Sequence, residues 1–278
     1  MALKEITIGH SPDPDDAFMF YALTHGKIDT GGLKIKHHIA GIEELNHKAV
    51  EGEFEVSALS VHAYGYTMDK YALMKCGGSF GDGVGPIVVA KKKMEIGELA
   101  DDRIAVPGTM TSAYLLLKLL LINFKFEVVP FDKIMDAVLN GDVDAGLLIH
   151  EGQLTHKKHG LHKIVDLGEW WQEDMNLPVP LGVNVVRKDL GKEMMQRLAK
   201  LTQESINYAM AHRTEAVDYS MKYGRGMDVK TTDKFVGMYV NKWTVDMGED
   251  GRRSITQLLT RAYHAALIPR PVHLEFVE

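Results

Sequence analysis

The sequence contains one cysteine, Cys76, and no surplus of positive charge. A single cysteine excludes an intrachain disulfide and a cysteine-based zinc site. The formal net charge is −6, and the basic residues form no stripe that could neutralise successive phosphates, so we expect no nucleic-acid partner. The sequence also lacks a His-Glu-x-x-His pair, a Walker motif and a nucleophile elbow. We therefore expect a site without a metal.

Long hydrophobic runs are also missing. The most apolar stretch, 113–122, is interrupted by Lys118 and is far shorter than the ~20 residues that a membrane helix needs, so we expect no membrane insertion. The first ten residues enter a strand pattern directly and lack the apolar core behind a basic start that is typical of secretory signals. These features predict a cytoplasmic protein.

Two stretches, 50–60 and 139–151, share one pattern: the end of a helix, a glycine, two acids separated by one residue, and a strand. The matching positions are Gly52 with Gly141, Glu53 with Asp142, and Glu55 with Asp144. The pattern fits two similar α/β units that face one ligand, and it also fits ordinary loop chemistry, with glycine as helix stop and acids in a solvated turn. A chain of 278 residues suits two lobes, because single cores stop growing near ~250–300 residues.

The expected architecture is α/β, with a ligand cleft between two lobes. The predicted lobes are residues 1–92 with 185–278, and residues 93–184. Residues 191–268 are helical in period and are expected to brace the first lobe. The glycine-rich stretch 77–86 resembles no phosphate loop and is better interpreted as a hinge or a cleft wall, since glycine permits backbone angles that other residues resist.

His150 is the predicted reacting group. It follows the apolar stretch 145–149, which is too short for a buried helix and suits an interior strand of a parallel sheet. Ligands of α/β proteins bind at the open end of such strands. Histidine is an effective base near neutral pH, because its ordinary pKa is ~6.5. The adjacent Glu151 could act as the base or orient the imidazole, but a carboxylate at a strand end is more often a solvated charge.

Polar residues precede two predicted helices. Ser11 and Asp16 belong to a proline-punctuated loop before the helix 17–24, where Asp15 or Asp16 fits an N-cap, so this loop is interpreted either as a binding loop or as a plain cap. Thr111 and Ser112 stand at the start of another helix. Hydroxyls and unpaired N–H groups there could hold a carboxylate, and the alternative is again a plain cap.

Ser60 ends the 55–60 strand and is the candidate binding residue there, one position before the equivalent of His150. Trp170 and Trp171 precede a proline-rich turn, and we expect one indole to line the cleft while the other packs in the core. The motifs in chain order are Ser11-Pro12-x-Pro14-x-Asp16, the 55–60 strand, Val106-Pro107-Gly108 with Thr111-Ser112-Ala113-Tyr114, Gly146-Leu-Leu-Ile-His150-Glu151, and Asp166-Leu-Gly-Glu-Trp-Trp171.

Together, over nearly the whole chain, these motifs resemble the 1,4-dihydroxy-6-naphthoate synthase family of the futalosine route to menaquinone. The resemblance implies a fold like that of type II periplasmic binding proteins. It also implies a cofactor-independent, lyase-type reaction on cyclic dehypoxanthine futalosine, a small carboxylate, with cleavage of carbon–carbon or carbon–oxygen bonds. The implied roles are His150 as proton acceptor, Ala58, Leu59 and Ser60 as substrate contacts, and Thr111 and Ser112 as contacts from the second lobe.

The loop at residues 11–18 departs from the family pattern Ser-Pro-Cys-Pro-Asn-Asp-Thr-Phe, with Asp13, Asp15 and Ala17 at the differing positions. Ala58 stands where the family has a lysine. These changes in charge leave the exact substrate open. The alternatives are a chorismate-dehydratase-like enzyme of the same pathway and a cytosolic protein that binds a small carboxylate without turnover. A homodimer is also left open.

Overall fold

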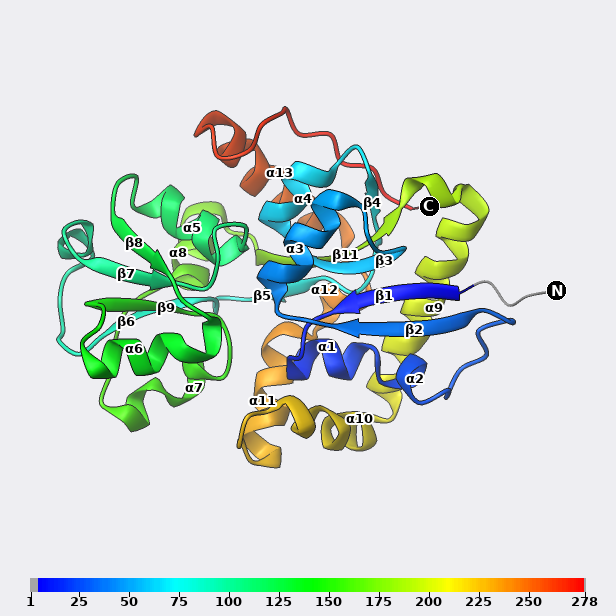
Figure 1. The fold of residues 1–278 in the computed structure, drawn as a ribbon, viewed down its shortest axis with the longest axis horizontal. Helices are drawn as coiled ribbons and strands as arrows, with labels where there is room; N and C mark the ends of the chain where they lie inside the picture. The colour runs from blue at the N-terminus through cyan, green and yellow to red at the C-terminus, as the bar shows by residue number, and fades with distance from the viewer. Residues whose placement is uncertain (1–4, 278) are drawn as a thin grey trace.

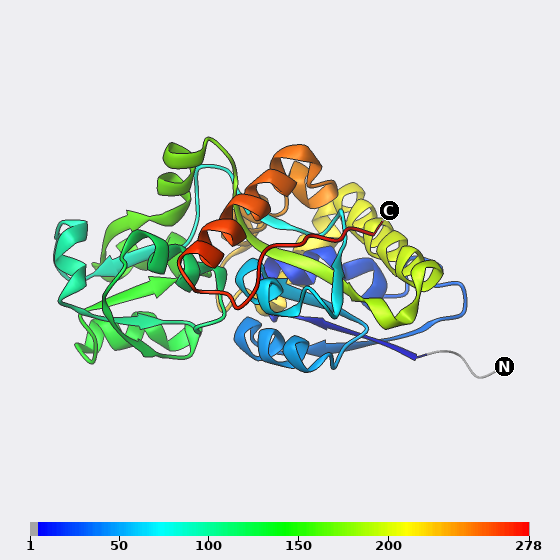
Figure 2. The same ribbon diagram turned by 90° about the horizontal axis from the view of Figure 1, so that it is seen from above.

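The computed structural model describes residues 5–277, which form two β-sheets, each flanked by helices (Figures 1 and 2). The sheets define two lobes that lie side by side in Figure 1. This architecture confirms the expected two-lobed α/β fold.

The first sheet has the order β2-β1-β3-β11-β4, and a short strand, β5, also pairs with β11. Its strands are β1 (Glu5–His10), β2 (Lys34–Ile39), β3 (Val56–Ser60), β4 (Tyr71–Leu73), β5 (Ser79–Gly81) and β11 (Val179–Arg187). Strand β1 is parallel to β2 and β3, whereas β11 is antiparallel to β3 and β4. Lys4, expected at the start of β1, lies outside the described residues.

The second sheet has the order β10-β6-β9-β7-β8. Its strands are β6 (Ile87–Ala90), β7 (Arg103–Val106), β8 (Lys125–Val128), β9 (Ala145–Leu148) and β10 (His162–Asp166). Strand β9 is a buried interior strand, as expected before His150, but the sheet is mixed and not parallel, because β9 is parallel to β7 and antiparallel to β6. Strand β8 ends at Val128, two residues before Pro130. Pro130 has no N–H for a sheet ladder, and a 3₁₀ turn begins at Phe131.

The lobe boundaries implied by the sheets differ from those expected. Strand β6 belongs to the second sheet although it falls within 1–92, and β11 joins the first sheet before residue 185. The chain therefore crosses between the sheets at 82–86 and at 176–178. The first crossover lies inside the glycine-rich stretch. The lobe to which a strand belongs depends on the strands with which it forms hydrogen bonds, and the local sequence does not reveal these partners.

Helices of the first lobe come from both ends of the chain, so its two segments form one compact unit (Figure 1). These helices are α1 (Pro14–Met19), α2 (Tyr21–Thr24), α3 (Ile42–Glu51), α4 (Val61–Thr67), α9 (Lys192–Ala211), α10 (Arg213–Ser220), α11 (Val229–Tyr239), α12 (Lys242–Val245) and α13 (Gly248–His264). Helix α1 packs against α9, α10 and α11, and α2 packs against α9.

The second lobe contains α5 (Ser112–Leu120), α6 (Ile134–Asn140), α7 (Gly152–Thr155) and α8 (Leu167–Met175). Short 3₁₀ turns complete the chain at Ile96–Ala100, Phe131–Lys133, His156–His159, Lys188–Leu190 and Met221–Tyr223. Helix α13 runs across the junction of the lobes in Figure 2 and contacts α4, α5 and β11. The indole N–H of Trp171 in α8 donates to Ser254 Oγ of α13 at 3.0 Å, so this tryptophan joins the lobes from inside the core.

Helix α1 begins at Pro14, three residues before the predicted start at residue 17. Proline is favoured in the first turn of a helix, where its missing N–H would have no helical partner. Asp13 occupies the N-cap position with extended backbone and makes no side-chain cap. The prediction that Asp15 or Asp16 is the N-cap is therefore wrong, because both lie inside the first turn.

The paired glycine-acid pattern is confirmed as two equivalent structures. Gly52 and Gly141 both end a helix in the left-handed conformation, with φ of 75° and 85°. The second acid of each pattern accepts a backbone N–H from the neighbouring parallel strand. The two pairs are Glu55 with Thr7 and Asp144 with Arg103, each at 2.9 Å. These acids therefore join adjacent strands instead of only solvating a turn.

Candidate functional site

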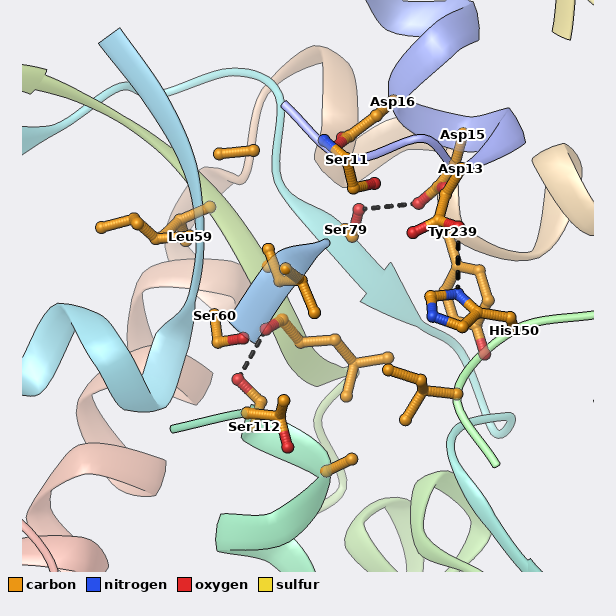
Figure 3. A pocket seen from close by; sticks show the side chains of 18 of the residues that line it. Ser11, Asp13, Asp15, Asp16, Leu59, Ser60, Ser79, Ser112, His150 and Tyr239 are labelled. Atoms are coloured by element: carbon orange, nitrogen blue, oxygen red, sulfur yellow. Dashed lines mark hydrogen bonds and ion pairs between the residues drawn. The ribbon is translucent and has the colours of Figure 1, made fainter. Parts of the chain in front are cut away.

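A cavity that is partly open to solvent lies between the lobes. It is lined by the loop between β1 and α1, the end of β3, the start of α5, the turn after β9, and parts of β11 and α11. All eight residues predicted for the site line this one cavity: Ser11, Asp16, Ala58, Leu59, Ser60, Thr111, Ser112 and His150. Figure 3 shows His150 facing the cavity from the side opposite Ser60 and Ser112. Their roles in binding and catalysis stay predictions.

The N-cap residue and the first turn of α1 contribute three carboxyl groups to the cavity, those of Asp13, Asp15 and Asp16. Asp16 Oδ2 accepts the Ser11 N–H at 2.7 Å, and Asp15 Oδ2 accepts from Ser79 Oγ at 3.3 Å. Burial raises the pKa of Asp16 to about 6, although the bond from Ser11 opposes this shift. Burial, together with Asp16 and Asp13, raises the pKa of Asp15 well above its ordinary value. Burial and the neighbouring carboxylates thus disfavour the charged form of Asp15.

Asn46 of α3 holds Ser60 in place. Its side-chain oxygen accepts the Ser60 N–H at 2.9 Å, and its side-chain nitrogen donates to Ser60 Oγ at 3.0 Å. The same nitrogen lies 3.3 Å from the Met110 carbonyl of the second lobe. Asn46 is fully buried, so these bonds satisfy a polar group that would otherwise be costly to bury.

Thr111 and Ser112 use their hydroxyls within the protein. Thr111 caps α5, accepting the Tyr114 N–H at 3.1 Å, and donates to the Gly108 carbonyl at 2.9 Å. Ser112 Oγ donates to the Leu181 carbonyl at 2.6 Å and accepts the His62 N–H at 3.3 Å. Thr111 is thus a helix N-cap, which was one of the two alternatives for this stretch, and it also lines the cavity.

His150 is 8% exposed, and its imidazole packs edge-on against the Phe131 ring at a centroid distance of 4.0 Å. Its Nδ1 lies 3.3 Å from Asp13 Oδ1, and its buried Nε2 has no hydrogen-bond partner among residues 5–277. Burial lowers the pKa of His150, and the carboxylates of Asp13 and Glu151 only partly oppose this. The imidazole is therefore neutral at rest, as a general base must be.

Arg225, in the loop before α11, contacts carboxylates of both lobes. Its Nη1 and Nη2 donate to Asp13 Oδ1, each at 3.2 Å, and Nη1 also donates to Glu151 Oε2 at 3.0 Å. The guanidinium stacks over Phe131, 4.5 Å from the ring centroid. Glu151 does not line the cavity and is held by this arginine, so the geometry does not favour Glu151 as the base.

The tryptophans do not line the cavity. Trp171 is fully buried, which confirms that one indole packs in the core, but the prediction that the other lines the cleft is wrong. The glycine-rich stretch does reach the cavity, through Gly77, Ser79 and Pro86. Among the described residues no group of three or more histidine, cysteine or acidic side chains could hold a metal. No helix between residues 5 and 277 is long and apolar enough to cross a bilayer.

Sequence reasoning missed several residues around the cavity. Asn46 carried a detectable signal, because it lies on the same face of α3 as the apolar Ile42, Leu45 and Ala49, where a polar group needs a partner. Arg225 stands between two glycines, but nothing local indicates which carboxylates it contacts.

The C-terminal helices do more than brace the first lobe. Phe235 and Tyr239 of α11 line the cavity. The Tyr239 hydroxyl donates to Gln153 Oε1 of the second lobe at 2.5 Å. No motif marks these positions, because they reach the cavity only through the packing of α11 against α1.

The chain is similar to known proteins over nearly its whole length. The chain is 38% identical to the 1,4-dihydroxy-6-naphthoate synthase of Thermus thermophilus, over 97% of this chain and 99% of that protein. It is also 38% identical to the 1,4-dihydroxy-6-naphthoate synthase of Streptomyces coelicolor, over 97% of this chain and 96% of that protein.

Solved structures extend the comparison to the fold. The crystal structure of protein AF1704 from Archaeoglobus fulgidus is 48% identical, with a TM-score of 0.91, over 95% of this chain and 98% of that one. The periplasmic aliphatic sulphonate binding protein of Escherichia coli is 11% identical, with a TM-score of 0.68 over 98% and 96%, which shows the periplasmic-binding-protein fold. A family model described as menaquinone biosynthesis matches residues 6–264. The chain belongs to this menaquinone biosynthesis family.

Proposed function

We propose that this protein is a 1,4-dihydroxy-6-naphthoate synthase that converts cyclic dehypoxanthine futalosine, with His150 as the general base. The observation that carries the proposal is the buried imidazole of His150, whose Nε2 lacks a partner among the described residues and whose ring lines the cavity between the lobes. The names of the two relatives at 38% identity support the naphthoate product.

In the proposed reaction, His150 Nε2 removes a proton made acidic by a substrate carbonyl. The C–H electron pair enters the ring system, the sugar-derived ring opens and departs, and the naphthalene diol becomes aromatic. Aromatisation supplies the driving force in this scheme, which makes the reaction lyase-type and independent of a cofactor. A positioned base typically contributes ~10²–10⁴-fold to the rate of such a step.

The charges around the cavity support one substrate orientation. Asp13, Asp15 and Asp16 lie on one side, and the N-terminus of α5 lies on another. Negative charge is favourable at a helix N-terminus and unfavourable beside other carboxylates. We therefore place the substrate carboxylate near Ser112 and the sugar-derived hydroxyls near Asp13, Asp15 and Asp16, whose carboxyl oxygens can accept hydrogen bonds from them.

Incubating the purified protein with cyclic dehypoxanthine futalosine and following the naphthoate product tests the proposal directly. Steady product formation is expected. Tight binding without product would instead identify a binding protein. In a parallel incubation with chorismate, dehydration of that substrate would identify a chorismate-dehydratase-like enzyme. We also propose that the enzyme acts in the cytoplasm, in keeping with the biosynthetic role named for its relatives, and cell fractionation tests this location.

A further inference from the structure

We propose that Asp13 and Arg225 are positioning residues for His150: Arg225 holds the Asp13 carboxylate, and Asp13 holds the imidazole with its proton on Nδ1, so that Nε2 faces the substrate. This inference rests on the proposed function for the role of His150, and it adds the two residues that orient the base.

The first step is the tautomer of His150. Asp13 Oδ1 lies 3.3 Å from Nδ1, and a carboxylate oxygen can only accept a hydrogen bond. The proton of the neutral imidazole is therefore favoured on Nδ1, which leaves Nε2 with the lone pair. Nε2 is also the ring nitrogen that has no protein partner among residues 5–277. In the opposite tautomer, Nδ1 would carry a lone pair facing Asp13 Oδ1, so two hydrogen-bond acceptors would lie against each other.

The second step is the position of Asp13 itself. Both terminal nitrogens of Arg225 donate to Oδ1 of this carboxylate, the oxygen nearest the imidazole, and Nη2 also donates to the Pro12 carbonyl at 3.2 Å. Asp13 is 5% exposed, so its charge needs such a partner. The planar guanidinium holds the loop backbone and the carboxylate together, which a single ammonium could not do with the same geometry.

The third step is that these contacts cross the cleft. Asp13 and Arg225 belong to the first lobe, whereas His150 and Glu151 belong to the second, and Arg225 donates to Glu151 as well as to Asp13. The Phe131 ring packs against both the imidazole and the guanidinium. The base therefore gains its orientation only when the lobes are in the arrangement seen here, which couples cleft closure to catalysis.

Four charged groups act on His150 from the elements packed around it. Asp13 comes from the loop before α1, Glu151 follows in the chain, Asp132 lies in the turn before α6, and Arg225 comes from the loop before α11. The three carboxylates raise the pKa of the imidazole and Arg225 lowers it, in addition to the larger lowering by burial. Removing one of the three carboxylates should thus lower the pKa of His150, and removing Arg225 should raise it.

The test is nitrogen NMR of the histidine rings in the full-length protein, with the His150 signals assigned by their loss in His150→Gln. The unmodified protein should show the proton on Nδ1. The pKa of His150 should fall in Asp13→Asn, where a negative charge is lost but the acceptor oxygen remains. It should rise in Arg225→Met. Turnover of Arg225→Met should fall at least ~10-fold with a smaller change in KM, because a misplaced base slows the chemical step.

Arg213→Met is the matched control. Arg213 also pairs with an aspartate, Asp233, at 2.8 Å and lies over an aromatic ring, Phe18, but it does not line the cavity. It should leave the tautomer and the pKa of His150 unchanged.

The outcomes separate this inference from the proposed function. A proton on Nε2 in the unmodified protein, or shifts of the same sign in both variants, overturns the inference even if naphthoate is formed. The Nδ1 tautomer with opposite shifts supports it even if no product forms from cyclic dehypoxanthine futalosine, in which case only the proposed function fails.

Discussion

The Glu43 carboxylate accepts the backbone N–H of Met110 across the cleft, with Oε1 and Oε2 at 3.1 and 3.2 Å from the nitrogen. Asn46, three residues later on the same face of α3, lies within hydrogen-bond distance of the Met110 carbonyl. One helix of the first lobe therefore binds both backbone groups of a single residue in the second. This contact joins the two lobes beside Ser60, to which Asn46 also donates.

Gly108→Ala should weaken that closure. Gly108 has φ of +153°, and an added Cβ would lie 2.2 Å from Glu43 Cδ, so the Glu43 carboxylate must leave Met110. We expect KM to rise more than turnover falls, and the free energy of unfolding to drop by about 1–3 kcal/mol. Substrate titration and denaturant unfolding measure the two effects. Gly97→Ala, where no atom lies within 4 Å of the new Cβ, is the control, and equal KM values in the two variants would contradict the prediction.

His150→Ala and His150→Gln should each lose at least ~10²-fold in turnover, because a positioned base contributes that much to proton transfer. The fold and much of the substrate affinity should persist, as measured by circular dichroism and calorimetric titration. The control is His156→Gln, since His156 is also a buried histidine of the second lobe but does not line the cavity. Near-full turnover in folded His150→Ala would remove the assignment of the base.

Asp16→Asn should change how stability depends on pH. Burial raises the folded pKa of Asp16 from 3.8 to about 6, so this group stabilises the fold below pH ~4, and the contribution is lost as the pH rises through about 6. The asparagine variant has no such loss and keeps an oxygen for the Ser11 N–H. Its stability relative to the unmodified protein should increase between pH ~4 and ~6, by on the order of 1–3 kcal/mol, and then stay constant.

Denaturant unfolding across this pH range measures the difference for Asp16→Asn. Asp218→Asn, at an exposed position on α10, is the control for replacing an aspartate by asparagine. A constant difference between Asp16→Asn and the unmodified protein at every pH would show that Asp16 is not held in the protonated form.

Thr111→Ala should affect stability as well as binding. The hydroxyl caps α5 and also donates to Gly108, so its removal leaves the Tyr114 N–H without its cap and should cost about 1 kcal/mol of unfolding free energy. Substrate binding should weaken more than turnover falls, because the start of α5 lines the cavity. Thr111→Ser keeps the oxygen and should behave like the unmodified protein in thermal unfolding and in KM. A loss of equal size in the serine variant would point to packing of the methyl group instead.

Local patterns were enough to predict the strand before His150, the paired glycine-acid units and the two-lobed class. Gly141 illustrates why, since a helix stop and a following apolar run are encoded within a few neighbouring residues. The start of α1 and the position of β8 were less predictable, because Pro14 and Pro130 each shift an element boundary by a few residues. Prolines restrict the backbone but do not by themselves say which side of them an element occupies.

The sequence by itself determined which chemical groups are available: one strand-end histidine, hydroxyls at the start of a helix, and three acids at residues 13–16. Only the tertiary structure decided that Asp13 and Arg225, more than 200 positions apart, meet beside His150. It also decided that Thr111 caps its helix and that Asn46 reaches Ser60. Contacts between lobes depend on how whole elements pack against one another, and such distant pairings leave no periodicity or spacing in the chain.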